Sequence, residues 1–498
     1  MKIEVFGNIN KYYVQTLCMI FFPGVKFSEN EADDDGLSAT VRVTENELGA
    51  TAEVELISGD KVTTAVRSED YKQEIPAERT VKLAVGAAVI AAAGDMVGYK
   101  PSWGMLTGVR PSKVATELLN SGYSKTRVKK ILNTEYFVVP KKASLATDVA
   151  LNEAAIIGTP DERDCSVYIS IPFCPSRCAY CSFVSYTSKK LLSLIPEYVE
   201  RLVSDVKSTF GTINKLGLRV KTVYIGGGTP TTLTAEQLEV LLSTINECTD
   251  VTALEEFTLE SGRPDTITAE KFAVAKKYGV TRICVNPQSL SDEVLKGIGR
   301  SHNSADFFKA YDIARESGIK YINTDLIVGL PGDNFKSFSA TFDKILQLRP
   351  DNITVHTFCV KKSSDFLRNG SNVYSLRGGD AGKCVDYSQI KSLQAGYKPY
   401  YMYRQKNTVG NYENVGFALD GAEGRYNIYM MEEVHSIFAV GAGAVSKMVK
   451  YSSNKDEKPV IERIFHLKYP YEYLADDRMN DICRQYEDFY NKNFNFEQ

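Results

Sequence analysis

Between residues 165 and 358, short runs of apolar and β-branched residues alternate with longer stretches whose apolar residues recur every three or four positions. The first pattern is typical of buried strands and the second of amphipathic helices. The predicted strands are 167–171, 222–225, 256–260, 282–286, 321–328 and 352–358, and the predicted helices are 195–210, 235–248, 269–278, 305–316 and 335–348. Six such units predict an α/β fold built on a partial (β/α)6 barrel of TIM type, short of the eight units of a closed barrel.

The pattern changes on both sides of this barrel. Alternating β-formers at residues 2–6, 38–43 and 52–58, followed by an Ala-rich helical stretch at 80–93, predict a small N-terminal α+β domain over residues 1–160. The barrel is expected over residues 161–394, after the polar segment TPDERD. A Tyr- and Gly-rich stretch then opens a C-terminal α+β domain at residues 395–498, which we expect to cover the mouth of the barrel.

Composition narrows the class of protein. A chain of 498 residues with 43% hydrophobic residues is long enough for two or three domains. Its formal net charge of -3 gives no electrostatic footprint for nucleic acid. No secretory signal opens the chain, and the apolar run at 81–93 is too short to span a bilayer, so no membrane span is expected. Ten cysteines, mostly scattered, favour a reducing compartment, and we expect a cytoplasmic protein.

Three of those cysteines form the chemical centre of the sequence. The segment 168–183 reads YISIPFCPSRCAYCSF and places Cys174, Cys178 and Cys181 in a C-x3-C-x2-C pattern. Three thiolates without a fourth ligand suit a 4Fe–4S cluster with one iron left open, because such a cluster normally takes four cysteines. A structural zinc site is the alternative, although Cys165 is the only other cysteine or histidine within thirty residues.

At these residues the chain resembles the radical S-adenosylmethionine (SAM) enzymes, and within them the oxygen-independent coproporphyrinogen III oxidase-like family, above all its HemZ-type members. The resemblance covers residues 166–363. It implies that the open iron chelates the amino and carboxylate groups of SAM, and that one electron from the reduced cluster releases methionine and a deoxyadenosyl radical that abstracts hydrogen. The resemblance leaves open whether a second SAM molecule binds.

The same resemblance implies which residues contact SAM. The glycine segment after the second strand, taken alone, is explained by a tight turn, and Glu260 by a solvated strand end. Gln288 and Arg300, as isolated residues, would have surface or structural roles, although an arginine fork suits the methionyl carboxylate. The implied SAM neighbours are Tyr168, Tyr180, Gly227, Gly228, Thr229, Glu260, Gln288, Arg300, Asp325 and the backbone near Cys359.

Asp325 is the carboxylate that the pattern itself singles out, because it interrupts an apolar strand. A buried charge needs a partner, so a structural salt bridge is the alternative to SAM contact. Tyr400, Tyr401, Tyr403 and Arg404 combine aromatic faces with a cation that could grip a tetrapyrrole carboxylate, but an aromatic core explains them equally well. Trp103, Arg110 and the four histidines are expected to serve packing or surface roles.

The resemblance implies an oxidoreductase of haem biosynthesis that converts coproporphyrinogen III to protoporphyrinogen IX, with reduced flavodoxin or ferredoxin as electron donor. Three features depart from the family pattern: Ser182 and Phe183 stand where decarboxylating members have a further cysteine, Ser170 replaces a histidine, and RQKN replaces E-x-S-N-F. Two alternatives therefore stay open. One is a haem-binding carrier or chaperone without decarboxylase activity, and the other is a different radical reaction on a tetrapyrrole.

Overall fold

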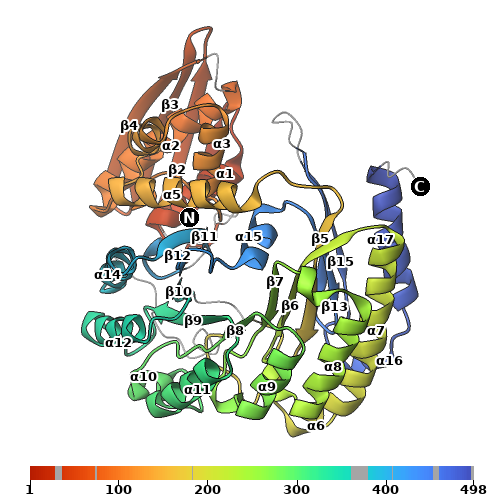
Figure 1. The fold of residues 1–498 in the computed structure, drawn as a ribbon. Helices are drawn as coiled ribbons and strands as arrows, with labels where there is room; N and C mark the ends of the chain where they lie inside the picture. The colour runs from red at the N-terminus through yellow and green to blue at the C-terminus, as the bar shows by residue number, and fades with distance from the viewer. Residues whose placement is uncertain are drawn as a thin grey trace.

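The computed structural model describes residues 1–27, 36–72, 76–181, 183–359, 379–405, 408–452 and 459–494. Figure 1 shows the small N-terminal unit, in red and orange, standing beside a large sheet that is covered by helices on its outer face. The large sheet has eleven strands in the order β11-β12-β10-β9-β8-β7-β6-β5-β13-β14-β15.

Six consecutive parallel strands form the centre of this sheet. They are β5 (Asp164–Ile171), β6 (Arg219–Gly227), β7 (Glu256–Leu259), β8 (Arg282–Cys284), β9 (Tyr321–Val328) and β10 (Asn352–Thr357). The intervening helices are α6 (Lys189–Leu192), α7 (Ile195–Lys215), α8 (Ala235–Cys248), α9 (Ala269–Lys277), α10 (Asp292–Gly297), α11 (Ser304–Glu316) and α12 (Phe335–Leu348). The predicted partial (β/α)6 barrel is confirmed, and every predicted strand and helix of the barrel is present.

Local chemistry explains where these helices begin. Thr234 caps α8 and exchanges hydrogen bonds with Gln237, while Asn303 and Asp306 form the same capping box on α11. In α7, Tyr198, Leu202 and Val206 recur at a helical spacing and are buried. These caps and stripes fix the helices on the outside of the sheet, so that the carboxyl ends of all six strands open on the same side.

The C-terminal segment extends both edges of the same sheet. After α14 (Ala381–Gln394), β11 (Lys398–Arg404) and β12 (Glu413–Ala418) join the β10 edge by antiparallel pairing. At the other edge, β13 (Ser436–Val440) pairs in parallel with β5, and β14 (Val445–Lys450) and β15 (Val460–Phe465) follow in antiparallel order. The remaining helices are α15 (Arg425–Glu432), α16 (Pro470–Ala475) and α17 (Met479–Asn493). The strands expected in a separate C-terminal domain thus continue the sheet of the barrel.

The N-terminal unit is a four-stranded sheet with α2 packed across β3 and β4. Its elements are β1 (Lys2–Phe6), α1 (Lys11–Phe21), β2 (Leu37–Glu45), β3 (Gly49–Ser58), β4 (Lys61–Asp70), α2 (Ala77–Val97), α3 (Ser112–Asn120), α4 (Lys125–Thr134) and α5 (Pro140–Ile157). At 21 residues, α2 is longer than predicted and is apolar and long enough to cross a membrane, yet most of its apolar stretch is buried in this fold. We therefore describe it as a core helix of the N-terminal unit.

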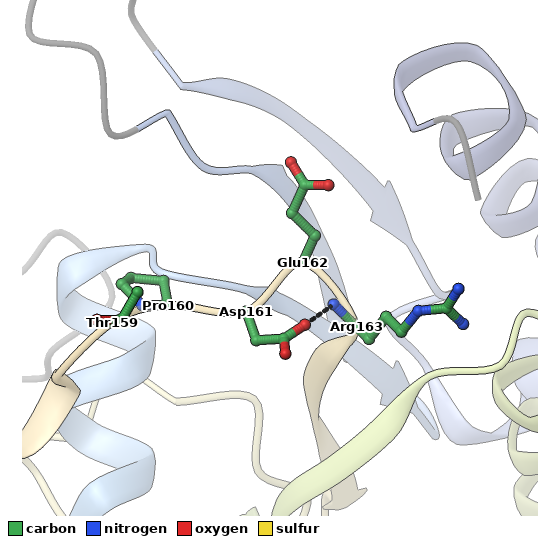
Figure 2. Close-up of a pocket in the computed structure, with 5 residues that line it drawn as sticks. All are labelled: Thr159, Pro160, Asp161, Glu162 and Arg163. Carbon is green, nitrogen blue, oxygen red and sulfur yellow. Dashed lines mark hydrogen bonds between the residues drawn. The ribbon is translucent and has the colours of Figure 1, made fainter. Parts of the chain in front are cut away.

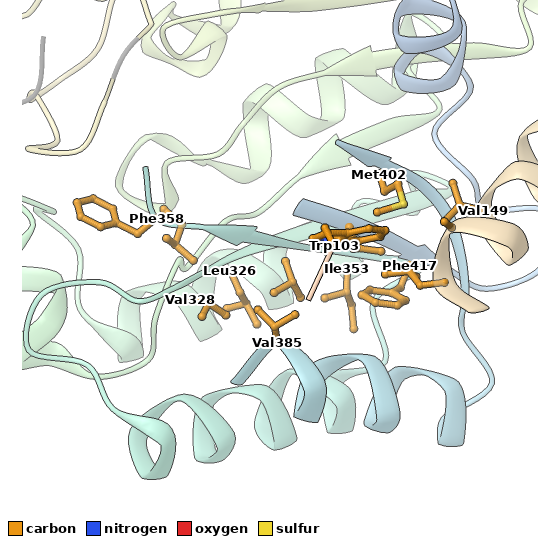
Figure 3. Close-up of a cluster of buried hydrophobic side chains, with 14 of the residues drawn as sticks. Trp103, Val149, Leu326, Val328, Ile353, Phe358, Val385, Met402 and Phe417 are labelled. Atoms are coloured by element: carbon orange, nitrogen blue, oxygen red, sulfur yellow. The ribbon is translucent and has the colours of Figure 1, made fainter. Parts of the chain in front are cut away.

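A shared hydrophobic core joins this unit to the barrel. Figure 3 shows Trp103 among side chains from β9, β10, α14, β11 and β12, with Val149 of α5 at one end. Trp103 is 1% exposed, and the predicted packing role of this only tryptophan is confirmed. The N-terminal unit is thus attached through buried apolar surface rather than through a solvated linker alone.

Candidate cofactor site at the carboxyl ends of the parallel strands

The three motif cysteines lie on the loop that follows the carboxyl end of β5. Cys174 and Cys178 are buried and Cys181 is partly exposed. Backbone hydrogen bonds hold this loop from two sides, since Cys174 N donates to Tyr186 O at 3.1 Å and Ala179 N donates to Ile298 O at 3.0 Å. The loop is irregular, as the sequence predicts, and a fixed irregular loop can aim several thiols at one object.

Arg263, which the sequence did not indicate as a site residue, holds the same loop through Ser176. Its guanidinium, 4% exposed, donates to Ser176 O at 3.1 Å and lies 3.5 Å from Cys178 Sγ. Asp265 holds the other edge of the guanidinium with two hydrogen bonds of 3.0 Å. In a single sequence, an arginine four residues after a strand resembles a surface residue, so only the loop contact reveals its role.

The chemistry of the thiols fits a cluster. Burial raises the pKa of Cys174, and the neighbouring thiols of Cys181 and Cys178 raise it further, although a contact with Thr229 Oγ1 at 3.2 Å opposes the shift. Thiols that are close together and buried need a positive group before all of them can ionise, and bound iron supplies it. Three thiols on one loop leave one iron of a 4Fe–4S cluster without a protein ligand.

The glycine segment after β6 packs directly on the cysteine loop. Gly227 has a φ of +109°, and a Cβ there would lie 2.8 Å from Ile171 N. A Cβ on Gly228 would lie 2.6 Å from Phe173 O, so both positions require glycine. Gly228 N and Thr229 N donate to Ile171 O and Phe173 O at 2.7 and 2.8 Å. The glycines are thus explained by close backbone packing, and the same packing places Thr229 beside Cys174.

A chain of polar side chains crosses the interior from β6 to β11. Tyr224 Oη donates to Glu260 Oε2 at 2.5 Å, and Asn286 Nδ2 donates both to Glu260 Oε1 at 3.2 Å and to Asp325 Oδ2 at 3.1 Å. His356 Nε2 lies 3.6 Å from Asp325 Oδ2, and its Nδ1 is 3.2 Å from Tyr403 Oη. Glu260 and Asp325, predicted separately, thus share one network with an asparagine and a histidine that the sequence did not single out.

The electrostatics of this network favour a cationic ligand. Burial raises the pKa of Glu260, and the Asp325 carboxylate raises it further. Among the described residues, His356 is the ion-pair partner within 4 Å of Asp325, and this pair is a salt bridge only when the imidazole is protonated. The Asp325 side chain keeps 22% of its surface exposed. Two adjacent carboxylates that face accessible space can stabilise a positively charged molecule.

Aromatic side chains border these carboxylates. Tyr168 of β5 is in register with Tyr224 of β6, and their rings stack with centroids 6.1 Å apart. Tyr426 of α15 stacks on Tyr224 at 4.6 Å. Tyr168 therefore lies beside the network, as predicted for a SAM neighbour, and α15 of the C-terminal segment reaches the same place.

Arg300 and Tyr180, both predicted to contact SAM, contact each other. Arg300 Nη2 and Nε approach Tyr180 Oη at 2.8 and 3.1 Å, and Nη1 donates to Gly262 O at 3.0 Å. Gln288 has a φ of +65°, which is strained for a residue with a side chain, and its buried Oε1 accepts no hydrogen bond from the described residues. A buried acceptor without a donor and a strained backbone both suit a ligand contact.

Other candidate residues lie elsewhere or are already engaged. Cys359 follows β10, and its backbone forms an isolated antiparallel β-bridge with Thr408. Arg404 is 5% exposed, donates to Leu106 O and Asn411 Oδ1, and lies over the Trp103 ring, so its carboxylate-gripping role is not supported. Tyr400 and Tyr401 are buried, in line with an aromatic core, whereas Tyr403 joins the polar network. Arg110 binds Met431 O and Glu433, as expected for packing.

The three histidines other than His356 lie outside the polar network. His435 and His466 are buried and hydrogen-bonded to Ser166 Oγ and Ala439 O, which confirms packing roles. His302 is buried with no hydrogen-bond partner for either ring nitrogen among the described residues. The turn at Gly441 lies against β5, where Ser170 Oγ donates to Ala442 O at 2.9 Å.

One surface pocket lies at the opposite end of β5. Figure 2 shows its lining residues, Thr159, Pro160, Asp161, Glu162 and Arg163, with Arg163 N donating to Asp161 Oδ1 at 2.8 Å. These residues precede the amino end of β5, whereas the cysteine loop follows its carboxyl end. This pocket is therefore separate from the candidate cofactor site.

Comparisons with known proteins identify relatives of this chain. The model of the radical SAM superfamily matches residues 168–345. The chain is 35% identical over 439 residues to the oxygen-independent coproporphyrinogen-III oxidase-like protein HemZ of Bacillus subtilis, covering 84% of this chain and 87% of that protein. It is 32% identical over 281 residues to the heme chaperone HemW of B. subtilis, covering 56% and 70%. The solved coproporphyrinogen III oxidase HemN of Escherichia coli aligns with a TM-score of 0.46 and 21% identity over 60% of this chain and 67% of that one.

Proposed function

The chain belongs to the radical SAM superfamily and, within it, to the family of HemZ, and from this membership we propose that it catalyses a radical reaction on a tetrapyrrole. Proteins of this superfamily bind a 4Fe–4S cluster and SAM. We propose specifically the oxygen-independent oxidative decarboxylation of coproporphyrinogen III to protoporphyrinogen IX. The observation that carries the proposal is the convergence of the thiol loop, the Arg300–Tyr180 pair and the Glu260–Asp325 network at the carboxyl ends of the strands.

In this proposal, each group of residues has a separate task. Cys174, Cys178 and Cys181 would hold three irons and leave the fourth for SAM. When bound, the cluster and SAM would supply a radical that takes a hydrogen atom from a propionate side chain, which would then lose carbon dioxide and pass one electron to an acceptor to leave a vinyl group. Arg263 keeps the thiol loop in place through Ser176, and the backbone contacts of Gly228 and Thr229 hold its other side.

The polar residues would orient SAM. The Glu260 and Asp325 carboxylates would stabilise its positive charge, and Arg300 could receive its carboxylate in a fork geometry once released from Tyr180. Gln288 would donate or accept through the amide that has an unpaired oxygen in this structure. The stacked Tyr168, Tyr224 and Tyr426 would exclude water beside these groups.

Anaerobic product analysis tests the proposal. The reconstituted protein is incubated with coproporphyrinogen III, SAM and reductant, and deoxyadenosine is measured beside the tetrapyrroles. Decarboxylation predicts harderoporphyrinogen and then protoporphyrinogen IX, with deoxyadenosine rising in step and all three absent in Cys178→Ala. A linear tetrapyrrole would instead indicate another radical reaction.

A haem carrier is the second candidate, and one observation favours it. Phe183, 71% exposed, stands where decarboxylating members of the family have a further cysteine. The heme chaperone HemW of B. subtilis is also among the relatives of this chain. This alternative predicts tight haem binding with no tetrapyrrole product under conditions in which SAM is cleaved. A titration of the reconstituted protein with haem, followed by visible absorbance, measures that binding directly.

A further inference from the structure

An exposed aromatic and basic surface lies beside the cysteine loop and has no role in the proposed reaction. We call it the loop patch and define it by Phe183, Lys189, Lys190, Lys468, Tyr469 and Tyr471. Phe183, Tyr469 and Tyr471 are 71%, 39% and 52% exposed. Exposed aromatic side chains that gather in one place mark interaction sites on otherwise polar surfaces.

Two chain segments far apart in sequence build the loop patch. Tyr186, between Phe183 and Lys189, donates from its Oη to Lys468 O at 3.1 Å, and its ring lies 5.8 Å from that of Tyr469. The rings of Tyr469 and Tyr471 stack 5.5 Å apart. These contacts fix the chain around Tyr186 against the segment that carries Lys468, Tyr469 and Tyr471.

The loop patch is connected directly to the candidate cluster ligands. Tyr186 O accepts from Cys174 N at 3.1 Å, and Tyr186 N donates to Pro172 O at 2.8 Å. Arg177, an exposed residue within the cysteine motif itself, donates to Ser185 O at 3.4 Å. A protein bound to the patch would thus contact a segment that is hydrogen-bonded to the backbone of Cys174.

The charge of this region is opposite to that of the whole chain. From Cys174 to Ile195 the chain carries Arg177, Lys189 and Lys190 and no acidic residue, while the full sequence has a net charge of -3. In the second segment, Lys468 adds a further exposed cation, and Glu472, Asp476 and Asp477 follow it as acids, so the cations gather on the Cys174–Ile195 segment. A local cationic surface on an anionic protein selects an acidic partner and speeds its encounter.

We propose that the loop patch is the docking surface for an acidic one-electron carrier protein of the flavodoxin type. This inference rests on the proposed function, because it assumes that the three thiols hold a cluster that must be reduced. One electron would pass from the flavin hydroquinone, which becomes the semiquinone, to the cluster. Small interfaces with a few aromatic contacts and complementary charge suit such transient electron-transfer complexes.

The test reverses the charge of the patch without touching the thiols. The variant Lys189→Glu/Lys190→Glu and the variant Tyr471→Ser are compared with Lys336→Glu/Lys344→Glu, which reverses two exposed lysines on α12, a helix of the barrel's outer face. The probe is a purified acidic flavodoxin in its reduced form. Anaerobic bleaching of the visible cluster absorbance gives the reduction rate, and biolayer interferometry with oxidised flavodoxin gives the affinity.

We expect the double patch variant to be reduced by flavodoxin about tenfold more slowly at low ionic strength, with the difference shrinking at 0.5 M salt. Affinity should fall in parallel, Tyr471→Ser should weaken binding at all salt concentrations, and the α12 variant should behave like wild type. Dithionite, which needs no docking surface, should reduce all four proteins at equal rates.

The outcomes separate this inference from the proposed function. A wild-type protein that retains no iron and sulfide, or whose cluster dithionite does not reduce, contradicts the proposed function. A normal cluster that flavodoxin does not reduce, or reduces equally in the patch and α12 variants, overturns the docking surface alone. A wild-type dimer in sedimentation that the double patch variant abolishes would also overturn it, because the patch would then be an interface between copies of this chain.

Discussion

At the scale of single residues, the motif cysteines differ from Cys165 in what surrounds them. Cys165 is fully buried in β5, where burial raises the pKa of its thiol, and it packs in the main hydrophobic core. The motif cysteines lie on a loop with Thr229 and Arg263 as polar neighbours. The difference in surroundings, rather than distance along the chain, separates candidate ligands from a structural thiol.

Cys174→Ala, Cys178→Ala and Cys181→Ala should each abolish the cluster, because each thiolate would hold one iron and the loop offers no replacement. Iron and acid-labile sulfide are measured after anaerobic reconstitution. Cys165→Ala, the matched control, should keep full iron and sulfide even if its stability falls. A complete cluster in any of the three motif variants would refute the ligand assignment.

Asp325→Asn and Arg300→Ala should weaken SAM binding about ten- to a hundredfold while leaving iron content unchanged, since a charge-assisted contact contributes about 1.5–3 kcal/mol. The measurement is a SAM titration of the reconstituted protein followed by electron paramagnetic resonance. Arg315→Ala, which removes an arginine paired with Asp351 outside the site, is the control and should bind SAM normally. Wild-type affinity for SAM in both site variants would show that Asp325 and Arg300 have structural roles and do not bind SAM.

Sequence alone located the charged residues of the site but not their connections. Asp325 stood out because it interrupts an apolar strand, whereas Asn286, two residues after β8, and His356 of β10 gave no signal until the fold brought them beside it. Arg263 gave no signal, because its partner Ser176 is 87 residues away in the chain. Pairings of this kind depend on tertiary structure, which hydrophobic periodicity does not encode.

At the scale of helices and strands, the sequence predicted the barrel well and its edges poorly. The six barrel strands are buried and apolar, so their pattern is strong. Strand β4 was missed because its residues are mostly exposed and polar. Parallel pairing of β13 with β5 joins residues about 270 positions apart, and nothing local in either strand specifies that partner.

The contact between α5 and α15 contains an unusual pair of acids. Glu153 of α5 is 2% exposed, and neither of its carboxylate oxygens has a hydrogen-bond partner among the described residues. Burial raises the pKa of Glu153 well above its ordinary value of 4.5, and the nearby Glu432 raises it further, while Arg110 and Ser112 oppose the shift. Lys113 and Glu433 also act on Glu432.

The folded protein should therefore lose stability as pH rises. Because the folded-state pKa of Glu153 is raised, its favourable contribution is complete below about pH 4.5 and declines as the pH passes through the raised value. Glu153→Gln should flatten this decline and raise the free energy of unfolding at pH 8 by about 1–3 kcal/mol. Urea unfolding at several pH values measures it, with the exposed Glu47→Gln as control. An unchanged pH slope in Glu153→Gln would contradict the assignment.

At the scale of the whole molecule, the N-terminal unit and the C-terminal strands meet at a buried ionic junction. Lys142 of α5, 2% exposed, places Nζ 2.5 Å from Glu413 Oε1 of β12, and Trp103 Nε1 donates to Glu413 Oε2 at 2.8 Å. Arg404 of β11 lies over the Trp103 ring with its guanidinium carbon 5.8 Å from the ring centroid. Strand β12 in turn pairs with β10, next to the strand that carries Asp325.

This junction predicts that the N-terminal unit and the barrel unfold together. Glu413→Ala would leave the Lys142 ammonium and the Trp103 N–H buried without their acceptor, which costs about 3–5 kcal/mol, whereas Glu413→Gln keeps an acceptor for Trp103 and should cost less. Lys141→Ala, which removes an exposed ion pair with Asp386, should change stability by less than about 1 kcal/mol.

Denaturant unfolding followed by tryptophan fluorescence and by far-ultraviolet circular dichroism distinguishes the two arrangements. Trp103 is the only tryptophan, so its fluorescence reports the junction, while circular dichroism reports the helices of the entire chain. If the units are coupled, both signals should change at one midpoint in wild type, and Glu413→Ala should move both midpoints to lower denaturant together. Separate midpoints in wild type, with Glu413→Ala shifting the fluorescence alone, would mean that the N-terminal unit folds independently.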